Sequence, residues 1–128
     1  MAQDPSELVF TMDKKYKLKN DGTDIFLDVI IGDKGQKPDL DIKLNSKALL
    51  PPGQDTSIKN LLVGKDTDLD KKILKITGNV VDTADDSNKI TVTIKVKGGV
   101  NDLSKKFSVS VEEDGEEVDI AFIIRFNF

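Results

Sequence analysis

The feature that most constrains the fold is an alternation of apolar and polar residues that recurs at short intervals along the chain. The clearest case closes the sequence, where every second residue from Val118 to Phe128 is apolar. Successive side chains of a β-strand point to opposite faces of a sheet, so this spacing predicts a strand with one dry face. Similar runs, separated by Gly, Pro, Asn and Asp, indicate an all-β fold. They span residues 7–12, 14–19, 23–32, 39–45, 72–82, 88–98, 105–113 and 118–128.

Strands with one dry face bury it when two sheets pack face to face, about 10 Å apart. The runs therefore predict a two-sheet antiparallel sandwich of seven or eight strands. A chain of 128 residues suits one hydrophobic core, so we expect a single domain over residues 1–128. The run 23–32 is apolar on part of both faces, which predicts a central strand. Four aromatic residues fall on core-facing positions: Phe107, Phe122, Phe126 and Phe128.

The alternation lapses between residues 46 and 71, where Pro-Pro-Gly occupies positions 51–53. Apolar residues then follow at helical spacing, and Gly64 is suited to end a helix. These apolar residues are Ile58, Leu61 and Leu62. We expect one short helical turn near residues 56–63, within a crossover from one sheet to the other.

Two absences limit the chemistry of the chain, because it contains no His and no Cys. They exclude thiol nucleophiles, disulfides, Ser-His-Asp triads and zinc sites built from thiolate or imidazole. Acid–base carboxylates need a concave pocket that raises the pKa of one of them, whereas the acidic residues here cluster in turn sequences. With no Trp and one Tyr, rings for stacking sugars or bases are scarce. We therefore expect no enzyme activity, no organic cofactor and no small-molecule ligand.

The charge balance bears on the class of partner. The formal net charge is -4, and Lys residues interleave with acidic residues instead of forming a basic run. The single Arg, Arg125, leaves the chain poorly equipped for bidentate recognition of phosphate. We expect neither nucleic acid nor a transmembrane helix, since no apolar run is long enough to span a bilayer. The first residues lack a signal peptide, but export remains open and a surface or extracellular location is favoured.

One acidic sequence has the spacing of a calcium loop. Asp66, Asp68 and Asp70 stand at alternate positions, as the first ligands of such a loop do. The match then ends, because Lys71 replaces the glycine of the sixth position and Thr77 the bidentate glutamate of the twelfth. Two further acidic segments, 82–88 and 112–119, could share a weakly held ion. Ca²⁺ binding through these loops is thus an alternative function, set against ordinary solvated turns.

The outer face of the closing strand is the candidate interaction surface. Ala121 and Ile123 make the middle of this strand apolar on both faces, before Arg125 returns to water. Together with the terminal Phe128, these residues predict contact with a protein partner or a second copy of the chain. A terminal Phe after such alternation is also typical of the last strand of an outer-membrane β-barrel, which is a second alternative. The low aromatic content and the high charge of the chain argue against it.

A resemblance to a known class follows from two stretches. "ITVTIKV" followed by "FSVSVEEDGEEVDIAFIIRF" resembles the last strands of immunoglobulin-like sandwich modules. "TDIFLDVII" and "DLDIKLNSKALLPPG" are distantly similar to a strand pair in the non-catalytic sandwich domains of transglutaminases. The resemblance implies a passive recognition or spacer module. We therefore expect a non-catalytic structural or protein-interaction domain, part of a surface, filament or virion assembly or of a larger extracellular protein.

Overall fold

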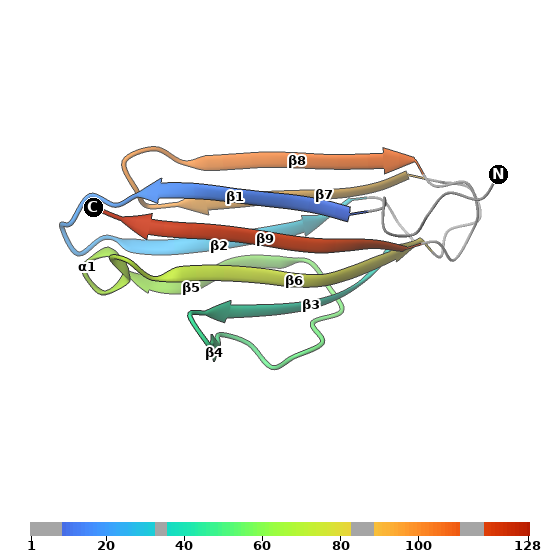
Figure 1. The fold of residues 1–128 in the computed structure, drawn as a ribbon, viewed down its shortest axis with the longest axis horizontal. Helices are drawn as coiled ribbons and strands as arrows, with labels where there is room; N and C mark the ends of the chain where they lie inside the picture. Colours follow the sequence, from blue (N-terminus) through green and yellow to red (C-terminus); the bar gives the residue numbers. More distant parts are fainter. Residues whose placement is uncertain (1–8, 33–35, 83–88, 111–116) are drawn as a thin grey trace.

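In the computed structural model the chain forms two β-sheets packed face to face (Figure 1). The structure describes residues 9–32, 36–82, 89–110 and 117–128. Sheet A contains, in spatial order, β1 (Val9–Lys17), β9 (Glu117–Asn127), β6 (Ile73–Asp82), β3 (Gln36–Leu44) and β4 (Lys47–Ala48). Sheet B contains β5 (Ile58–Lys65), β2 (Asp24–Ile31), β7 (Lys89–Lys97) and β8 (Leu103–Ser110). The predicted all-β two-sheet sandwich is therefore confirmed.

The closing stretch of the sequence becomes an internal strand. β9 pairs in parallel with β1 on one side and antiparallel with β6 on the other. All other strand pairs are antiparallel. β2 is also internal, as its two partly apolar faces predict, because it lies between β5 and β7. Runs 7–12 and 14–19 contribute to one strand, β1, instead of two.

The predicted helical turn is wrong in position. The segment near residues 56–63 belongs mostly to β5, and the short helix α1 covers Asp66–Leu69. A β-bulge causes the helix-like spacing, because Leu61 lies opposite Leu27 whereas Ile58 lies opposite Val29. The residues between them loop out, and Asn60 adopts a positive φ of 54°. The predicted crossover does exist, since the chain passes here from β4 in sheet A to β5 in sheet B.

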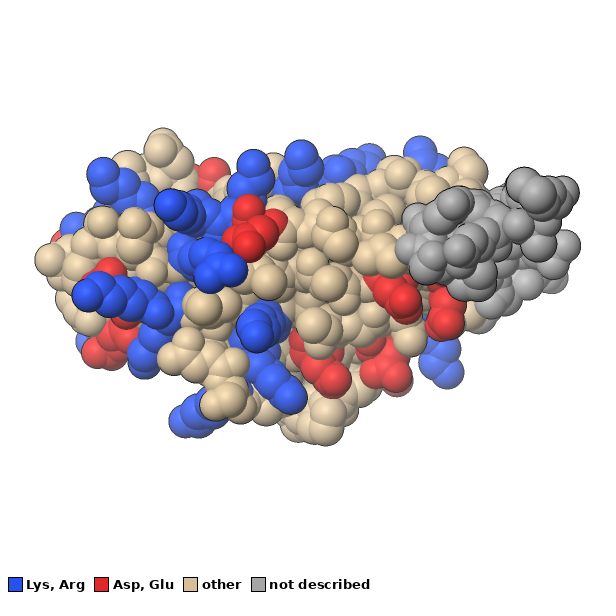
Figure 2. Space-filling view, in the orientation of Figure 1, with Lys and Arg blue, Asp and Glu red and all other residues tan. Residues whose placement is uncertain are grey.

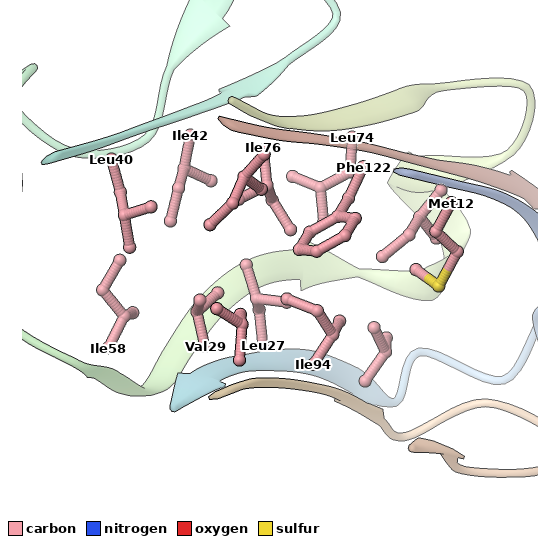
Figure 3. Packing of buried hydrophobic residues seen from close by; sticks show 14 of the residues in the cluster. Met12, Leu27, Val29, Leu40, Ile42, Ile58, Leu74, Ile76, Ile94 and Phe122 are labelled. Carbon is pink, nitrogen blue, oxygen red and sulfur yellow. The ribbon is translucent and has the colours of Figure 1, made fainter. Parts of the chain in front are cut away.

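The core lies between the two sheets and is almost entirely apolar (Figure 3). Leu40, Ile76 and Phe122 of sheet A face Leu27 and Ile94 of sheet B. Burying a large aliphatic side chain contributes about 1.5–3 kcal/mol, so such a core is the main stabilising term. These side chains come from strands far apart in the sequence.

The four aromatic residues that were predicted to face the core differ in how deeply they are buried. Phe122 and Phe126 are fully buried, and Phe107 is half-buried between two other rings. Its ring centroid lies 5.4 Å from that of Phe10 and 4.9 Å from that of Phe122. The prediction for Phe128 is wrong, because its side chain is 42% exposed. It follows the last residue of β9, so no neighbouring strand covers it.

Candidate interaction surface

The outer face of sheet A presents residues of four long strands side by side. The register places Thr11 of β1 and Thr77 of β6 on either side of Ala121 in β9. Asp41 of β3 continues this row beyond Thr77. Because side chains alternate along each strand, residues two positions away from each of these share the same face. We call this surface the sheet A face.

The predicted interaction residues on β9 do lie on this face. Ala121 is exposed, Ile123 is half-buried and Arg125 is exposed. Ile123 lies opposite Asp13 in β1 and Lys75 in β6. Phe128 lies beyond the end of the strand, and its backbone amide donates a hydrogen bond to Asp70 Oδ1 at 3.1 Å. The structure thus brings three of the four candidates together on one face and places the fourth beyond the end of β9.

Arg125 is held in place by a bidentate contact with Asp13 on the neighbouring strand. Its Nε and a terminal nitrogen donate to the two carboxylate oxygens at 2.9 and 3.1 Å. These hydrogen bonds keep the pKa of Asp13 below its usual range and raise the pKa of Arg125. Both side chains are about half exposed, so water screens the pair and its main effect is to orient Arg125. The sequence identified Arg125 but not Asp13, since the pairing depends on the parallel register of β1 and β9.

Charge is distributed unevenly along the sheet A face. Towards the C-terminal end of β9, the register gathers Lys15, Lys43, Lys75 and Arg125. Towards the other end lie the acidic residues Asp39, Asp119 and Glu117, whereas Asp13 lies in the basic half, paired with Arg125. Figure 2 shows this face, with Lys and Arg more frequent on the left and Asp and Glu gathered to the right of the centre. Between the two halves, the central row is uncharged in β1, β9 and β6, and Asp41 lies at its β3 end.

A small hollow borders this face beside β3. Its volume is about 150 Å³, and it is lined by Asp41, Ile42, Lys43, Ala48, Leu50 and Pro52. Leu49 N donates to Ile42 O at 2.9 Å, which holds the segment after β4 against β3. The Pro-Pro-Gly sequence, predicted as part of a crossover, thereby forms one wall of the hollow.

The three aspartates of the predicted calcium loop have separate surroundings. Asp66 is fully buried and accepts hydrogen bonds from the amides of Gly22 at 2.8 Å and Asp21 at 3.2 Å. Asp68 is exposed, and Asp70 accepts the amide of Phe128. Within the described ranges, no group of three His, Cys, Asp or Glu residues is arranged to hold a metal ion. The acidic segments predicted at 82–88 and 112–119 lie largely outside the described residues, so Ca²⁺ binding by them stays a prediction.

Comparison of the chain with protein-family models, with curated proteins and with solved structures found no match in any of the three. The resemblance to immunoglobulin-like modules therefore stays an expectation drawn from the strand pattern. Among the described residues, no helix has the length and apolar character needed to cross a membrane.

Proposed function

We propose that the chain is a non-catalytic protein-interaction domain whose sheet A face contacts a second copy of the same chain. The observation that carries the proposal is the division of this face into a mainly basic and a mainly acidic half, with the uncharged Thr11, Ala121 and Thr77 between them. A two-fold axis that runs along this row, across the strands, places the basic half of each copy over the acidic half of the other. Such an isologous contact is the commonest arrangement in protein oligomers.

The register gives the charge pairs that this arrangement would form. Arg125 and Glu117 lie four residues on either side of Ala121. Arg125 of each copy would therefore approach Glu117 of the other copy. Lys43 and Asp39 likewise lie two residues on either side of Asp41. By symmetry each pair would occur twice. Complementary charges of this kind set the orientation and suppress wrong partners more than they add affinity.

The size of the face suits a weak or transient dimer. Four strands spaced about 4.8 Å apart, each about 30 Å long, cover roughly 570 Å² per copy, or about 1,100 Å² in total. This slightly exceeds the roughly 1,000 Å² expected of a biological interface, and it is below the usual range of stable complexes. The domain would therefore associate when copies are held at high local concentration, as in a surface or filament assembly.

Sedimentation velocity of the wild type and Ala121→Arg tests this proposal. We expect the wild type to dimerise with a Kd of roughly 0.1–1 mM, and Ala121→Arg to remain monomeric, because a long charged side chain would enter the centre of the interface. Ala121 is exposed, so the melting temperature of the variant should match that of the wild type. A wild type that stays monomeric at about 1 mM would contradict the proposal.

A charge exchange tests the orientation of the two copies. Lys43→Glu and Asp39→Lys should each weaken self-association about tenfold, because each variant places like charges over one another twice. An equimolar mixture of the two variants should associate again, since both contacts become attractive in the mixed dimer. If the mixture associates no better than either variant alone, the proposed two-fold arrangement of the copies is wrong, even if the wild type forms dimers.

A further inference from the structure

We propose that the outer face of sheet B is a second binding surface, which takes an acidic protein segment that also carries apolar side chains. It lies on the opposite side of the sandwich from the sheet A face and does not depend on the dimer proposed above. We define the sheet B patch by six residues: Phe26, Ile30, Leu62, Lys95, Lys97 and Lys106.

The strand register places these six residues side by side. Phe26 of β2 lies opposite Leu62 in β5 and Lys97 in β7. Two rows along the strands, Ile30 lies opposite Thr93, which in turn lies opposite Lys106 in β8. Along β2 and β7, neighbours of these residues such as Leu27 and Ile94 are buried in the core. The patch side chains therefore point away from the core, with an apolar column over β5 and β2 beside a cationic column over β7 and β8.

One member of the apolar column is exposed and the other two are half-buried. Leu62 is 51% exposed, the largest value for a large hydrophobic side chain among the described residues. Phe26 and Ile30 are half-buried on the same face. Adjacent exposed apolar residues, in contrast to single scattered ones, are typical of binding surfaces. This column would contact the apolar side chains of the partner.

The cationic column has an excess of positive charge on a chain whose net charge is -4. Two carboxylates lie near the three lysines: Asp28, which is only 7% exposed, and Asp102, which lines a hollow together with Lys95 and Lys97. Asp28 Oδ2 lies 3.2 Å from Lys97 Nζ, and its Oδ1 accepts the amide of Asn60 at 2.6 Å. Lys97 is paired with Asp28 and Lys95 lies opposite Asp28, so the three lysines still outnumber the two carboxylates and leave an excess of positive charge for a ligand.

A hollow at the edge of the patch offers a place for an acidic side chain. Its volume is about 240 Å³, and its lining residues are Lys95, Lys97, Asp102, Leu103 and Ser104. Lysine is a compact point charge that pairs readily with a carboxylate, whereas bidentate phosphate recognition favours arginine. The apolar column next to these lysines favours a protein segment over a purely charged polymer. Bases of a single-stranded nucleic acid would need exposed rings, and Phe26 is half-buried.

Fluorescence anisotropy with labelled synthetic peptides tests the proposal. The probe is a twelve-residue peptide of glutamate and leucine, and the comparison peptides replace either every leucine by serine or every glutamate by glutamine. We expect the full-length chain to bind the first peptide with a Kd of about 10–100 μM and each comparison peptide at least tenfold more weakly. Equal binding of the glutamate–serine peptide would overturn the proposal, because it would show charge attraction alone.

Variants of the patch locate the binding site. Lys95→Glu/Lys106→Glu should weaken binding at least tenfold, and Leu62→Ser about three- to tenfold. Lys19→Glu/Lys47→Glu, at two exposed lysines outside the sheet B patch, changes the net charge equally, is the matched control and should bind as the wild type does. Lys97 is left unchanged because it is paired with Asp28. Circular dichroism melts of each variant separate loss of binding from loss of fold.

Three further results would decide whether the sheet B patch binds a protein segment. A sulfated oligosaccharide that binds as tightly as the peptide, with no effect of Leu62→Ser, would replace the protein partner by a polyanion and overturn the proposal. No peptide binding at about 1 mM would overturn it as well. Peptide binding by the monomeric Ala121→Arg variant would support the sheet B patch even if the dimer of the sheet A face does not form.

Discussion

At the scale of single residues, Asp28 illustrates how a charged group is accommodated in a central strand. Its position in β2 faces away from the core, yet Lys97 and the bulge at Asn60 cover it. Burial opposes ionisation of Asp28, but the Asn60 amide and the Lys97 ammonium outweigh that effect and hold its pKa below the usual value. The carboxylate therefore stabilises the bulge in β5, where the apolar residues have helix-like spacing along the sequence.

Replacing Asp28 by Asn should make the free energy of unfolding less dependent on pH in the acidic range. A carboxyl whose pKa is lowered by folding contributes stability above its unfolded pKa, about 3.9, and this contribution is lost as the pH falls through the lower folded pKa. We expect Asp28→Asn to lower the free energy of unfolding by about 1–3 kcal/mol at pH 7 and to differ less from the wild type near pH 2. Urea unfolding at both pH values measures this.

Asp24→Asn is the control for that experiment, since Asp24 is exposed on the same strand. It should change stability by less than about 0.5 kcal/mol at either pH. If Asp28→Asn lowers the free energy of unfolding equally at pH 7 and pH 2, the charge of Asp28 is not responsible for the stabilisation.

Tyr16 joins the edge strand β1 to the turn between β7 and β8. Its hydroxyl donates to Val96 O at 3.2 Å and accepts the amide of Gly99 at 2.9 Å. We expect Tyr16→Phe to cost about 1–2 kcal/mol in the free energy of unfolding, because the buried Gly99 amide loses its partner. Gly99→Ala should cost more, since its Cβ would lie 2.5 Å from Tyr16 Cε2 and 2.6 Å from Lys17 O. Urea unfolding should rank the two variants in this order; the reverse order would contradict the packing.

At the scale of elements, the position of β9 between β1 and β6 determines what a C-terminal truncation does. Phe126 is buried, its amide donates to Lys72 O at 3.0 Å, and its carbonyl accepts the amide of Lys71 at 2.9 Å. Leu18 N donates to Asn127 O at 2.7 Å. These bonds hold the end of the internal strand to both of its neighbours.

Deleting Phe126–Phe128 should therefore unfold the monomer and not merely abolish assembly. We expect loss of the β-sheet circular dichroism signal together with aggregation detected by light scattering, because both neighbours of β9 lose bonds and a buried ring is removed. Deleting Phe128 alone is the control and should leave the melting temperature within a few degrees, since its ring is largely exposed. A folded chain without residues 126–128 would show that the end of β9 is dispensable.

The edge strand β1 shows how an element is protected from unwanted pairing. Lys14 lies opposite Ile124, on the core-facing side of the sheet, yet its side chain is exposed. A charged residue that points inward on an edge strand is a common device against pairing with another sheet. Contacts between copies are therefore expected through faces and not through this edge.

At the scale of the whole molecule, the sandwich presents two outer faces of different character. The sheet A face carries both signs of charge and suits a copy of itself, whereas the sheet B patch is cationic with an apolar border. Because the faces lie on opposite sides, the two proposed contacts are sterically independent. Higher salt should weaken both, since exposed charges are screened beyond about 10 Å at 0.1 M. Such a domain could link copies of itself to an acidic partner within one assembly.

The sequence alone determined the fold class and most of the core. Alternation with period two reports which side of a strand is dry, and that is a local property of the chain. It therefore identified the buried positions of β7 and β9 and the central place of β2. It misplaced the helix, because a bulge in β5 mimics helical spacing and only pairing with β2 reveals it.

The tertiary structure alone decided the neighbours of each strand. Arg125 could be identified as a candidate, but its partner Asp13 comes from the other end of the chain through the parallel register of β1 and β9. The opposed charges of the sheet A face and the lysine column of sheet B arise in the same way, from strands that are distant in sequence. The physical reason is that a surface depends on which residues lie side by side across strands, whereas a sequence pattern records only which residues follow one another along them.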